Sequence, residues 1–432
     1  MSPEAIVGMA MGVTLVVALA SGLWIAIALF VTAFVMLHFF LDSPAGLILA
    51  TSVWGASANW SLTALPLFVL MGELLSRSSI AEQLFKALVP WTARIPGGLL
   101  HMNVLGAGAF ASVCGSSTAT TVTVGRIVLP ELLSRGYNEK IALGSLAGAG
   151  TFGLLIPPSI MFIIYGFTAE VSITKLFLAG VLPGVLMIVL FSGYIAIRAL
   201  LDPSIAPPSD TRVALAERLR LLVHLLPVGA LIVIIMASMY QGWATATEAA
   251  AVGVVGALMI IAASGNFSFA AFRDALLAAV RTTCMIGFIL AGAAYLTTAT
   301  TFSGIPQAIA SWIVAMDLNA YTLIAVLTVI YIFLGLFLEG VSMLVLTASF
   351  ILPMVKAAGI DLIWFGVYIV IVTEMALITP PVALNLFIVQ SLANRDAMYV
   401  ARAVIPFFLL MVAAVAILLV FPQIALFLPQ TM

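Results

Sequence analysis

Two pairs of adjacent prolines interrupt apolar stretches of the chain, at Pro157-Pro158 and at Pro380-Pro381. Proline has no backbone N–H, and its ring displaces the carbonyl four residues earlier in a helix. A carbonyl without a partner is costly in a nonpolar environment, so such breaks persist only where protein, water or an ion satisfies them. Each pair is therefore a candidate cation site, built on the carbonyls predicted to be freed: Gly153, Leu154, Ala376 and Leu377.

A small, hydroxyl-rich segment precedes the first proline pair. Its backbone can turn tightly and offer both carbonyl and hydroxyl oxygens to a cation. A closely packed helix face also favours small residues, and that alternative stays open. The segment is Gly115, Ser116, Ser117, Thr118, Ala119, Thr120 and Thr121.

The corresponding position before the second proline pair carries an acid. Glu339 lies among leucine, phenylalanine and valine, with Gly340 after it and Ser342 nearby. A carboxylate at the centre of a membrane helix costs about 2.5 to 3.5 kcal/mol on insertion scales, which makes Glu339 a functional candidate. The alternative is a position at the membrane surface. Carboxylate, hydroxyl and carbonyl oxygens suit a hard cation such as sodium.

The two candidate sites lie in a duplicated unit. Pro130 and Pro157 are as far apart as Pro353 and Pro380, and each Leu-Pro precedes a glycine by the same interval. Paired broken helices in two halves of a membrane protein are a strong sequence indication of a transporter's binding site.

Composition places this unit in a membrane. The chain is 64% hydrophobic and 8% charged, against about 25% charged in soluble domains. Apolar runs near 20 residues predict spanning helices, and the alternation of a membrane barrel is absent, so an all-α multi-pass protein in a lipid bilayer is expected. The net charge of -1 gives no reason to expect a nucleic-acid partner. Two cysteines and three scattered histidines, His38, His101 and His224, suggest neither a disulfide framework nor a transition-metal site.

The N-terminal apolar run is expected to be retained as membrane helix, broken near Ser21-Gly22, because it is too long for a signal peptide core. Separate helices are expected at residues 267–278 and 285–300.

The chain divides into four parts. The parts are N-terminal scaffold helices 1–60; a first repeat 61–200, with a re-entrant hairpin at about 113–135 and a broken helix 141–167; a connector 201–220; and a second half 221–428, with scaffold helices 221–281, a hairpin at about 337–357 and a broken helix 362–390.

Charge placement relates the two repeats. Arg135 and Lys140 follow the first Leu-Pro, whereas Arg395 and Arg402 follow the second proline pair. By the positive-inside rule the first Leu-Pro loop faces the cytoplasm and the second faces outward. The repeats are therefore predicted to be inverted. This assignment puts the connector, with Arg212, in the cytoplasm and requires residues 305–314 to cross the membrane.

Further residues are candidates for substrate contact. Asn385 follows the second break, and Thr118 and Ser342 belong to the two tips. Arg126 lies in an apolar stretch, where it could neutralise a carboxylate substrate, pair with Glu374 or extend to the surface.

Several motifs resemble the large membrane subunit of the tripartite ATP-independent periplasmic (TRAP) transporters, the DctM-like permeases. They occur in order over almost the whole chain: Leu65-Pro66-Leu67-Phe68 with Gly72-Glu73-Leu74; Gly97-Gly98-Leu99 with Asn103-Val104; Gly115-Ser116-Ser117 with Ala119-Thr120; Gly153 with Ile156-Pro157-Pro158-Ser159; Thr245 to Glu248 with three alanines; and Ile378-Thr379-Pro380-Pro381-Val382 with Leu384-Asn385-Leu386.

The resemblance implies an elevator-type transporter of the bacterial inner membrane, in which a moving domain with both hairpins carries a small carboxylate substrate and sodium. It implies two partners, a small four-helix DctQ-like membrane subunit and a periplasmic DctP-like binding protein, and no other cofactor. One sodium site would use Gly115, Ser116, Ser117 and the break at Gly153 and Pro157. The other would use Glu339, Gly340, Thr379 and the break at Ala376 and Pro380.

The chain departs from the family pattern at two positions. The family often has Asp at the position of Glu339 and Gly at the position of Ala383. The pattern assigns no role to Arg126. The open alternative is a self-sufficient sodium/dicarboxylate symporter of related architecture. An intramembrane enzyme is not expected, because no nucleophile with a base and no metal-binding pair is present.

Overall fold

The computed structural model of the 432-residue chain describes residues 3–78, 80–207, 215–223, 225–265, 267–308, 311, 319–380 and 383–432. Arg212, His224, Pro381 and half of the segment predicted at 305–314 therefore lie outside the described residues. All regular secondary structure in the described part is helical, which confirms the all-α prediction.

The described residues up to the connector form eleven α-helices. The prediction of a break near Ser21-Gly22 is confirmed, because the first helix ends at Ala20 and the next begins at Ile25. The helices are α1 Pro3–Ala20, α2 Ile25–Val35, α3 Ala45–Ser57, α4 Ala64–Ser76, α5 Ile80–Thr92, α6 His101–Cys114, α7 Ser117–Ser134, α8 Glu139–Gly150, α9 Phe152–Leu155, α10 Ile160–Ala169 and α11 Ile173–Leu201, with short elements η1 Met36–Phe40, η2 Trp60–Thr63, η3 Gly98–Leu100 and η4 Pro203–Ile205.

The second half differs from prediction at one long helix. Residues 267–278 and 285–300 were expected to form separate helices, but α15 runs unbroken through both, because the residues between them include no glycine or proline to end a helix. The described helices are α12 Leu215–Leu222, α13 Leu226–Tyr240, α14 Ala246–Ala263, α15 Phe269–Phe302, α17 Ala320–Leu334, α18 Gly340–Ala357, α19 Leu362–Ala376, α20 Leu384–Ala393, α21 Ala397–Val420 and α22 Gln423–Gln430.

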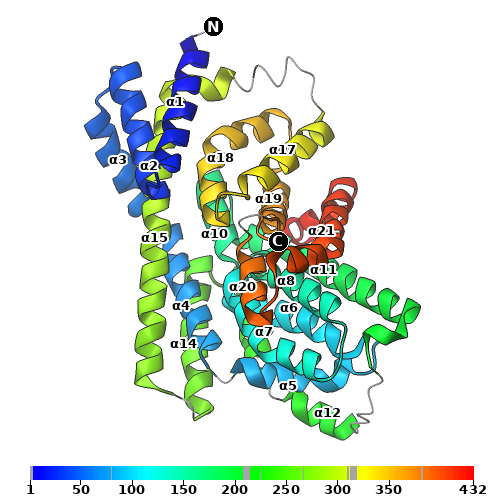
Figure 1. Cartoon of the computed structure of the whole chain (residues 1–432). Coiled ribbons are helices and arrows are strands. Elements are labelled where there is room, and N and C mark those ends of the chain that lie inside the picture. Colours follow the sequence, from blue (N-terminus) through cyan, green and yellow to red (C-terminus); the bar gives the residue numbers. More distant parts are fainter. Residues whose placement is uncertain are drawn as a thin grey trace.

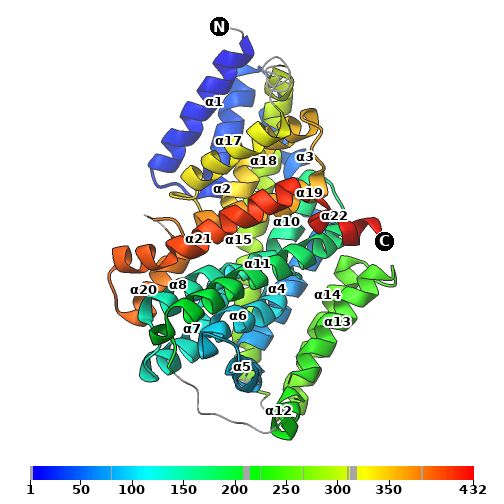
Figure 2. The ribbon, with the colours of Figure 1, turned by 90° about the vertical axis from the view of Figure 1, so that its right-hand side faces the viewer.

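The helices form two bodies. The long helix α15 lies along one side and packs against α2, α3 and α4, while α14 packs on α4 and α13 (Figure 1). The second body contains α6 to α11 and α18 to α22, with α8 packed on α21 and α7 on α20 (Figure 2). Five described helices are long and apolar enough to cross a membrane, or up to seven if each of two bent pairs counts as one span.

The duplicated unit has the same local structure in both copies. Helices α7 and α18 each have 18 residues and an internal proline, Pro130 or Pro353. Each is followed by a glycine with a left-handed backbone, Gly136 at φ +77° or Gly359 at φ +68°. The next helix then begins after a side-chain cap, from Asn138 in the first copy and Asp361 in the second.

Two contacts between the copies fix their relative orientation. Arg395, after α20, pairs with Glu139, after α7, so these two helices end on the same face. The Tyr165 hydroxyl of α10 donates to the Leu362 carbonyl at 2.7 Å, so α10 and α18 end together on the other face. In the first copy, α7 follows the tip and ends on the Glu139 face, while α10 follows the break and ends on the other face. In the second copy the faces are reversed, because α20 follows the break and ends on the Glu139 face. This reversal confirms the inverted repeats.

The connector lies on the face of the Glu139 and Arg395 pair. The backbone N–H of Asn138 donates to the Ile205 carbonyl at 2.9 Å, which ties the connector to the loop after α7. This agrees with the prediction that the connector and the first Leu-Pro loop share one side of the membrane.

Candidate functional site

The first tip is the turn between α6 and α7. Gly115 adopts a left-handed backbone (φ +62°) that ends α6, and the Ser116 hydroxyl caps α7 by accepting from the Ala119 N–H at 3.5 Å. Helices α6 and α7 pack along each other, so the hairpin has α6 as its first arm and begins earlier than the predicted residue 113. A Cβ added to Gly115 would lie 3.0 Å from the Pro158 carbonyl oxygen, so the tip touches the first break.

The first break separates α9 from α10. The rods of residues 139–155 and 160–169 meet at a bend of 45°. The Leu154 carbonyl, predicted to be free, instead accepts from the Ser159 hydroxyl. The Gly153 carbonyl has no hydrogen bond to any described residue, as predicted. Gly153 also lies against the tip backbone, because a Cβ there would be 2.4 Å from the Ser116 carbonyl oxygen.

The second tip places its acid at the start of α18. One Glu339 carboxylate oxygen accepts from the backbone N–H and the hydroxyl of Ser342, both at 3.3 Å, so Glu339 caps this helix as Ser116 caps α7. Glu339 is half-buried. A Cβ added to Gly340 would lie 2.7 Å from the Thr373 side chain, so the second tip packs directly on α19.

The second break corrects one prediction. The Ala376 carbonyl was expected to be free, but it accepts from the Thr379 N–H at 3.1 Å. The chain turns tightly before Pro380, so the N–H of Thr379, three residues after Ala376, donates in place of the N–H that Pro380 lacks. The Thr379 hydroxyl bonds to the Met375 carbonyl at 2.8 Å. The Leu377 prediction depends on Pro381, which lies outside the described residues.

The two tips and two breaks place four half-helices around one centre. Helix α7 packs on α20, and α10 packs on α18. Each member of a pair begins at a tip or a break and ends on the same face as its partner. The N-terminal, partly positive ends of the half-helices therefore converge. This arrangement suits anions between the tips, with cations at the tip and break oxygens.

The candidate substrate residues differ in exposure and in hydrogen bonding. Thr118 is exposed at the start of α7, and Ser342 is buried and bonded to Glu339. Asn385, at the start of α20, is 1% exposed, and neither of its amide atoms has a hydrogen-bond partner among the described residues. Its side chain is thus a buried polar group available to a ligand.

Arg126 lies away from both tips. It is exposed and lines a separate pocket of about 420 Å³, together with Glu82, Lys86 and Glu131. Of the three alternatives for Arg126, its exposure agrees with extension to the surface, whereas pairing with Glu374 is not found, because Glu374 is buried beside Ser117. Arg126 points to the outer side of α7, whereas Ser117 faces the centre, so one helix separates the two groups.

Sequence reasoning missed the position of Glu374. One of its carboxylate oxygens accepts from the Ser117 hydroxyl of the first tip, although the acid belongs to α19 of the second copy. Its signal was available, because Glu374 is the single charged residue in the apolar helix Leu362–Ala376.

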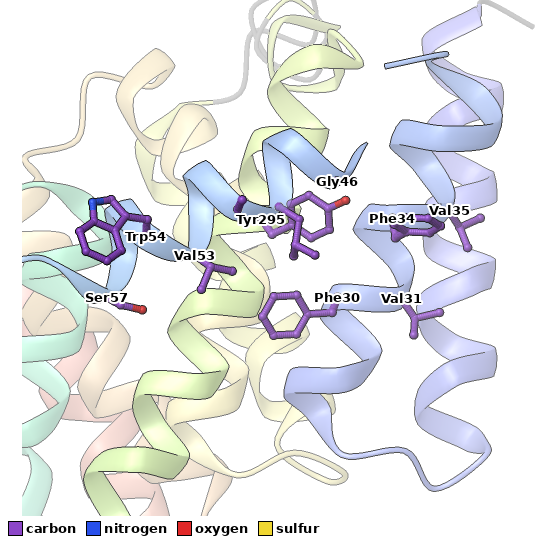
Figure 3. A pocket seen from close by; sticks show the side chains of 11 residues that line it. Phe30, Val31, Phe34, Val35, Gly46, Val53, Trp54, Ser57 and Tyr295 are labelled. Atoms are coloured by element: carbon purple, nitrogen blue, oxygen red, sulfur yellow. The ribbon is translucent and has the colours of Figure 1, made fainter. Parts of the chain in front are cut away.

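A large apolar groove lies outside the centre, on the α15 body. It has a volume of about 710 Å³ and is lined by α2 and α3, with Phe30, Trp54 and Tyr295 among its side chains (Figure 3). It has no charged lining residue, so it does not provide the oxygen ligands of a cation site.

Comparison with known proteins identifies the family. The family model described as the DctM component of tripartite ATP-independent periplasmic transporters matches residues 12–424. The chain belongs to this family. It is 33% identical to the C4-dicarboxylate TRAP transporter large permease protein DctM of Pseudomonas aeruginosa, over 88% of this chain and 89% of that protein.

Other TRAP large permeases carry different substrate names. The chain is 30% identical to a C4-dicarboxylate permease DctM of Vibrio cholerae, over 94% of both chains. It is 32% identical to the ectoine/5-hydroxyectoine permease UehC of Ruegeria pomeroyi, over 85% of this chain and 86% of that protein. In fold it resembles the YdaH transporter of Alcanivorax borkumensis, with a TM-score of 0.64, 14% identity, and coverage of 92% and 96%. The DctM family consists of transporter subunits, not enzymes.

Proposed function

We propose that this DctM-family chain is the large permease subunit of a sodium-coupled transporter that imports a small carboxylate substrate across the bacterial inner membrane. The observation that carries the proposal is the convergence of four half-helices from two inverted copies. Their positive ends favour a carboxylate, and the adjacent oxygens favour sodium. The names of the relatives cover C4-dicarboxylates and ectoine, so they support a family of substrates rather than one compound.

The sodium ions would lie at the two tips. Gly115, Ser116, Ser117 and the free Gly153 carbonyl supply oxygen ligands at the first. Glu339, Gly340 and Thr379 supply them at the second, where the Glu339 oxygen that does not cap α18 remains available. Hard cations prefer such carboxylate, hydroxyl and carbonyl ligands.

The two bodies of the fold suggest how the cargo moves. Both tips and both breaks belong to the body of α6 to α11 and α18 to α22, while α15 with α2 to α4 forms a separate support. We infer an elevator movement in which the body that contains the tips and breaks slides against the α15 body and carries the occupied centre across the membrane.

The proposal includes two partners, a small membrane subunit of the DctQ type and a soluble periplasmic binding protein of the DctP type. The second candidate function is a symporter that works alone. The purified chain should be reconstituted in liposomes with and without these partners, and uptake measured under an inward sodium gradient. Uptake that needs sodium and the binding protein supports the proposal. Sodium-driven uptake by this chain alone favours the symporter, and equal uptake in potassium contradicts sodium coupling.

A further inference from the structure

Glu374 is a buried carboxylate with one oxygen unused. It is 1% exposed, on α19, one turn before the second break. Its Oε1 accepts from the Ser117 hydroxyl, while its Oε2 has no hydrogen-bond partner among the described residues. Buried polar atoms normally have partners, so an unpartnered carboxylate oxygen points to a missing group.

No basic side chain among the described residues forms an ion pair with this acid. The ion pairs between described residues all involve other acids, namely Glu73, Glu131, Asp274 and Glu139. The charge that does act on Glu374 has the same sign, because it belongs to the Glu339 carboxylate. An uncompensated charge is expensive to bury, even after the surrounding protein relaxes. Two acids near one centre, without a base, make a strong attraction for a cation.

Further oxygen atoms that could bind a cation lie near Glu374. The Ser117 hydroxyl is already in contact with it. The backbone N–H of Leu154, which donates to the Thr151 carbonyl at 3.4 Å, is also close enough to interact with this carboxylate, so the first break lies next to the acid. The adjacent Gly153 is packed on the Ser116-Ser117 peptide, and its carbonyl has no hydrogen bond to a described residue. Hydroxyl, carbonyl and carboxylate form the ligand set that a hard cation takes.

The internal repeat explains why the acid comes from the other copy. The second tip has its own carboxylate, Glu339, but Ser116 occupies the matching position in the first tip. The first copy has Thr151 at the position that matches Glu374. The first tip therefore has no acid of its own in either place, and the packing of α19 brings one to it.

We propose that Glu374 is a ligand of the sodium ion at the first tip, so that this site is shared between the two copies. The inference rests on the proposed function, because it assigns a further ligand to one of the sodium sites. It also connects the sites, since Thr373, next to Glu374, contacts Gly340 of the second tip. An ion held by Glu374 fixes α19 against both tips at once.

The test measures sodium binding directly, in the purified complex of this chain with its small membrane subunit. Thermal unfolding is followed during titration with NaCl, with KCl at equal ionic strength as reference. Glu374→Gln keeps the shape of the side chain and can still accept from Ser117, but it removes the charge. We expect it to weaken the apparent sodium affinity at least about tenfold, as loss of a charge-assisted contact does. Glu131→Gln, an exposed acid on the same tip helix, is the matched control and should keep the wild-type affinity.

The outcomes separate the two levels of the proposal. If the wild-type complex responds equally to sodium and potassium, sodium coupling itself fails. If the wild type prefers sodium and Glu374→Gln keeps its full sodium affinity, only the role of Glu374 is overturned. The same conclusion holds if the variant changes the pH dependence of thermal unfolding but not the sodium affinity. If Glu374→Gln does not fold, Ser117→Ala and Glu374→Asp replace it: weakened sodium affinity in both supports the shared site, and wild-type affinity in both overturns it.

Discussion

Arg395 binds both carboxylate oxygens of Glu139, with its Nε 2.6 Å from Oε1 and its Nη2 3.0 Å from Oε2. The two residues come from different copies of the repeat, 256 positions apart. Glu139 follows the tip helix α7 of the first copy, and Arg395 follows the break helix α20 of the second. Their contact therefore shows directly that the two copies are inverted. The pair is at the surface, where such ion pairs add little stability. It is informative mainly because it shows which loops lie on the same face.

The inversion predicts which loops are reached from each side of the membrane. Cysteines introduced at Glu139 and Arg395 should react with an impermeant thiol reagent from the cytoplasmic side. Cysteines at Glu170 and Asp361 should react from the opposite side, because α10 and α18 end there. Labelling in intact cells and in inverted vesicles gives the measurement.

This labelling needs a silent background. The two native cysteines, buried Cys114 and exposed Cys284, are first replaced by alanine, and the resulting protein must show no label from either side. Reaction of all four new cysteines from one side would contradict the inverted repeats.

The contact between the first break and the first tip predicts a strong effect of one methyl group. In Gly153→Ala the new Cβ would lie 2.4 Å from the Ser116 carbonyl oxygen and 2.6 Å from the Ser117 nitrogen. These are backbone atoms, so the tip must shift, and overpacking of this kind costs about 1 to 3 kcal/mol. We expect sodium-driven uptake to fall at least about tenfold.

Gly193→Ala is the matched control for this change. Gly193 lies inside α11 with nothing within 4 Å of its added Cβ. Alanine is favoured over glycine in a helix, so this variant should keep uptake and should not lose thermal stability. Equal uptake by the two variants would show that the tip does not need its close approach to Gly153.

The two roles of Glu339 can be separated by a second capping acid. Glu339→Ala removes both the cap of α18 and the proposed sodium ligand. It should abolish most sodium-driven uptake and also lower stability, because loss of a cap costs about 0.5 to 2 kcal/mol.

Asp361→Ala removes the cap of α19, where the acid accepts from the N–H groups of Ile363 and Trp364 away from the tips. It should lower stability but keep the sodium dependence of uptake, and full sodium dependence in Glu339→Ala would remove the second site.

Asn385 offers a test of substrate contact that does not depend on sodium. Its buried amide has no hydrogen-bond partner in the described part of the chain, so replacing it with leucine removes an unsatisfied polar group and should not destabilise the fold. If the amide binds substrate, Asn385→Leu should raise the KM for uptake several-fold and leave the sodium-induced thermal stabilisation unchanged. An unchanged KM would exclude Asn385 from the substrate site.

The amino-acid sequence by itself determined the local chemistry of this protein. Apolar runs fixed the helical class, the equal spacing of Leu-Pro and Pro-Pro revealed the duplicated unit, and tip residues such as Gly115 and Glu339 marked where helices begin. These features follow from nearby residues, because a proline or a capping side chain acts within about one helical turn. The charge distribution also indicated the inversion, since loop charges respond to the membrane and not to packing.

Only the tertiary structure decided which of these groups meet. Ser117 and Glu374 are 257 positions apart and touch because α19 packs against the first tip. Arg126 is only nine residues from Ser117, yet it faces an outer pocket because helix geometry turns it away. The Thr379 N–H donates a hydrogen bond to the Ala376 carbonyl in a tight turn, and proline spacing does not specify this turn. Contacts between distant segments depend on how whole helices pack, and residue spacing along one segment does not contain that information.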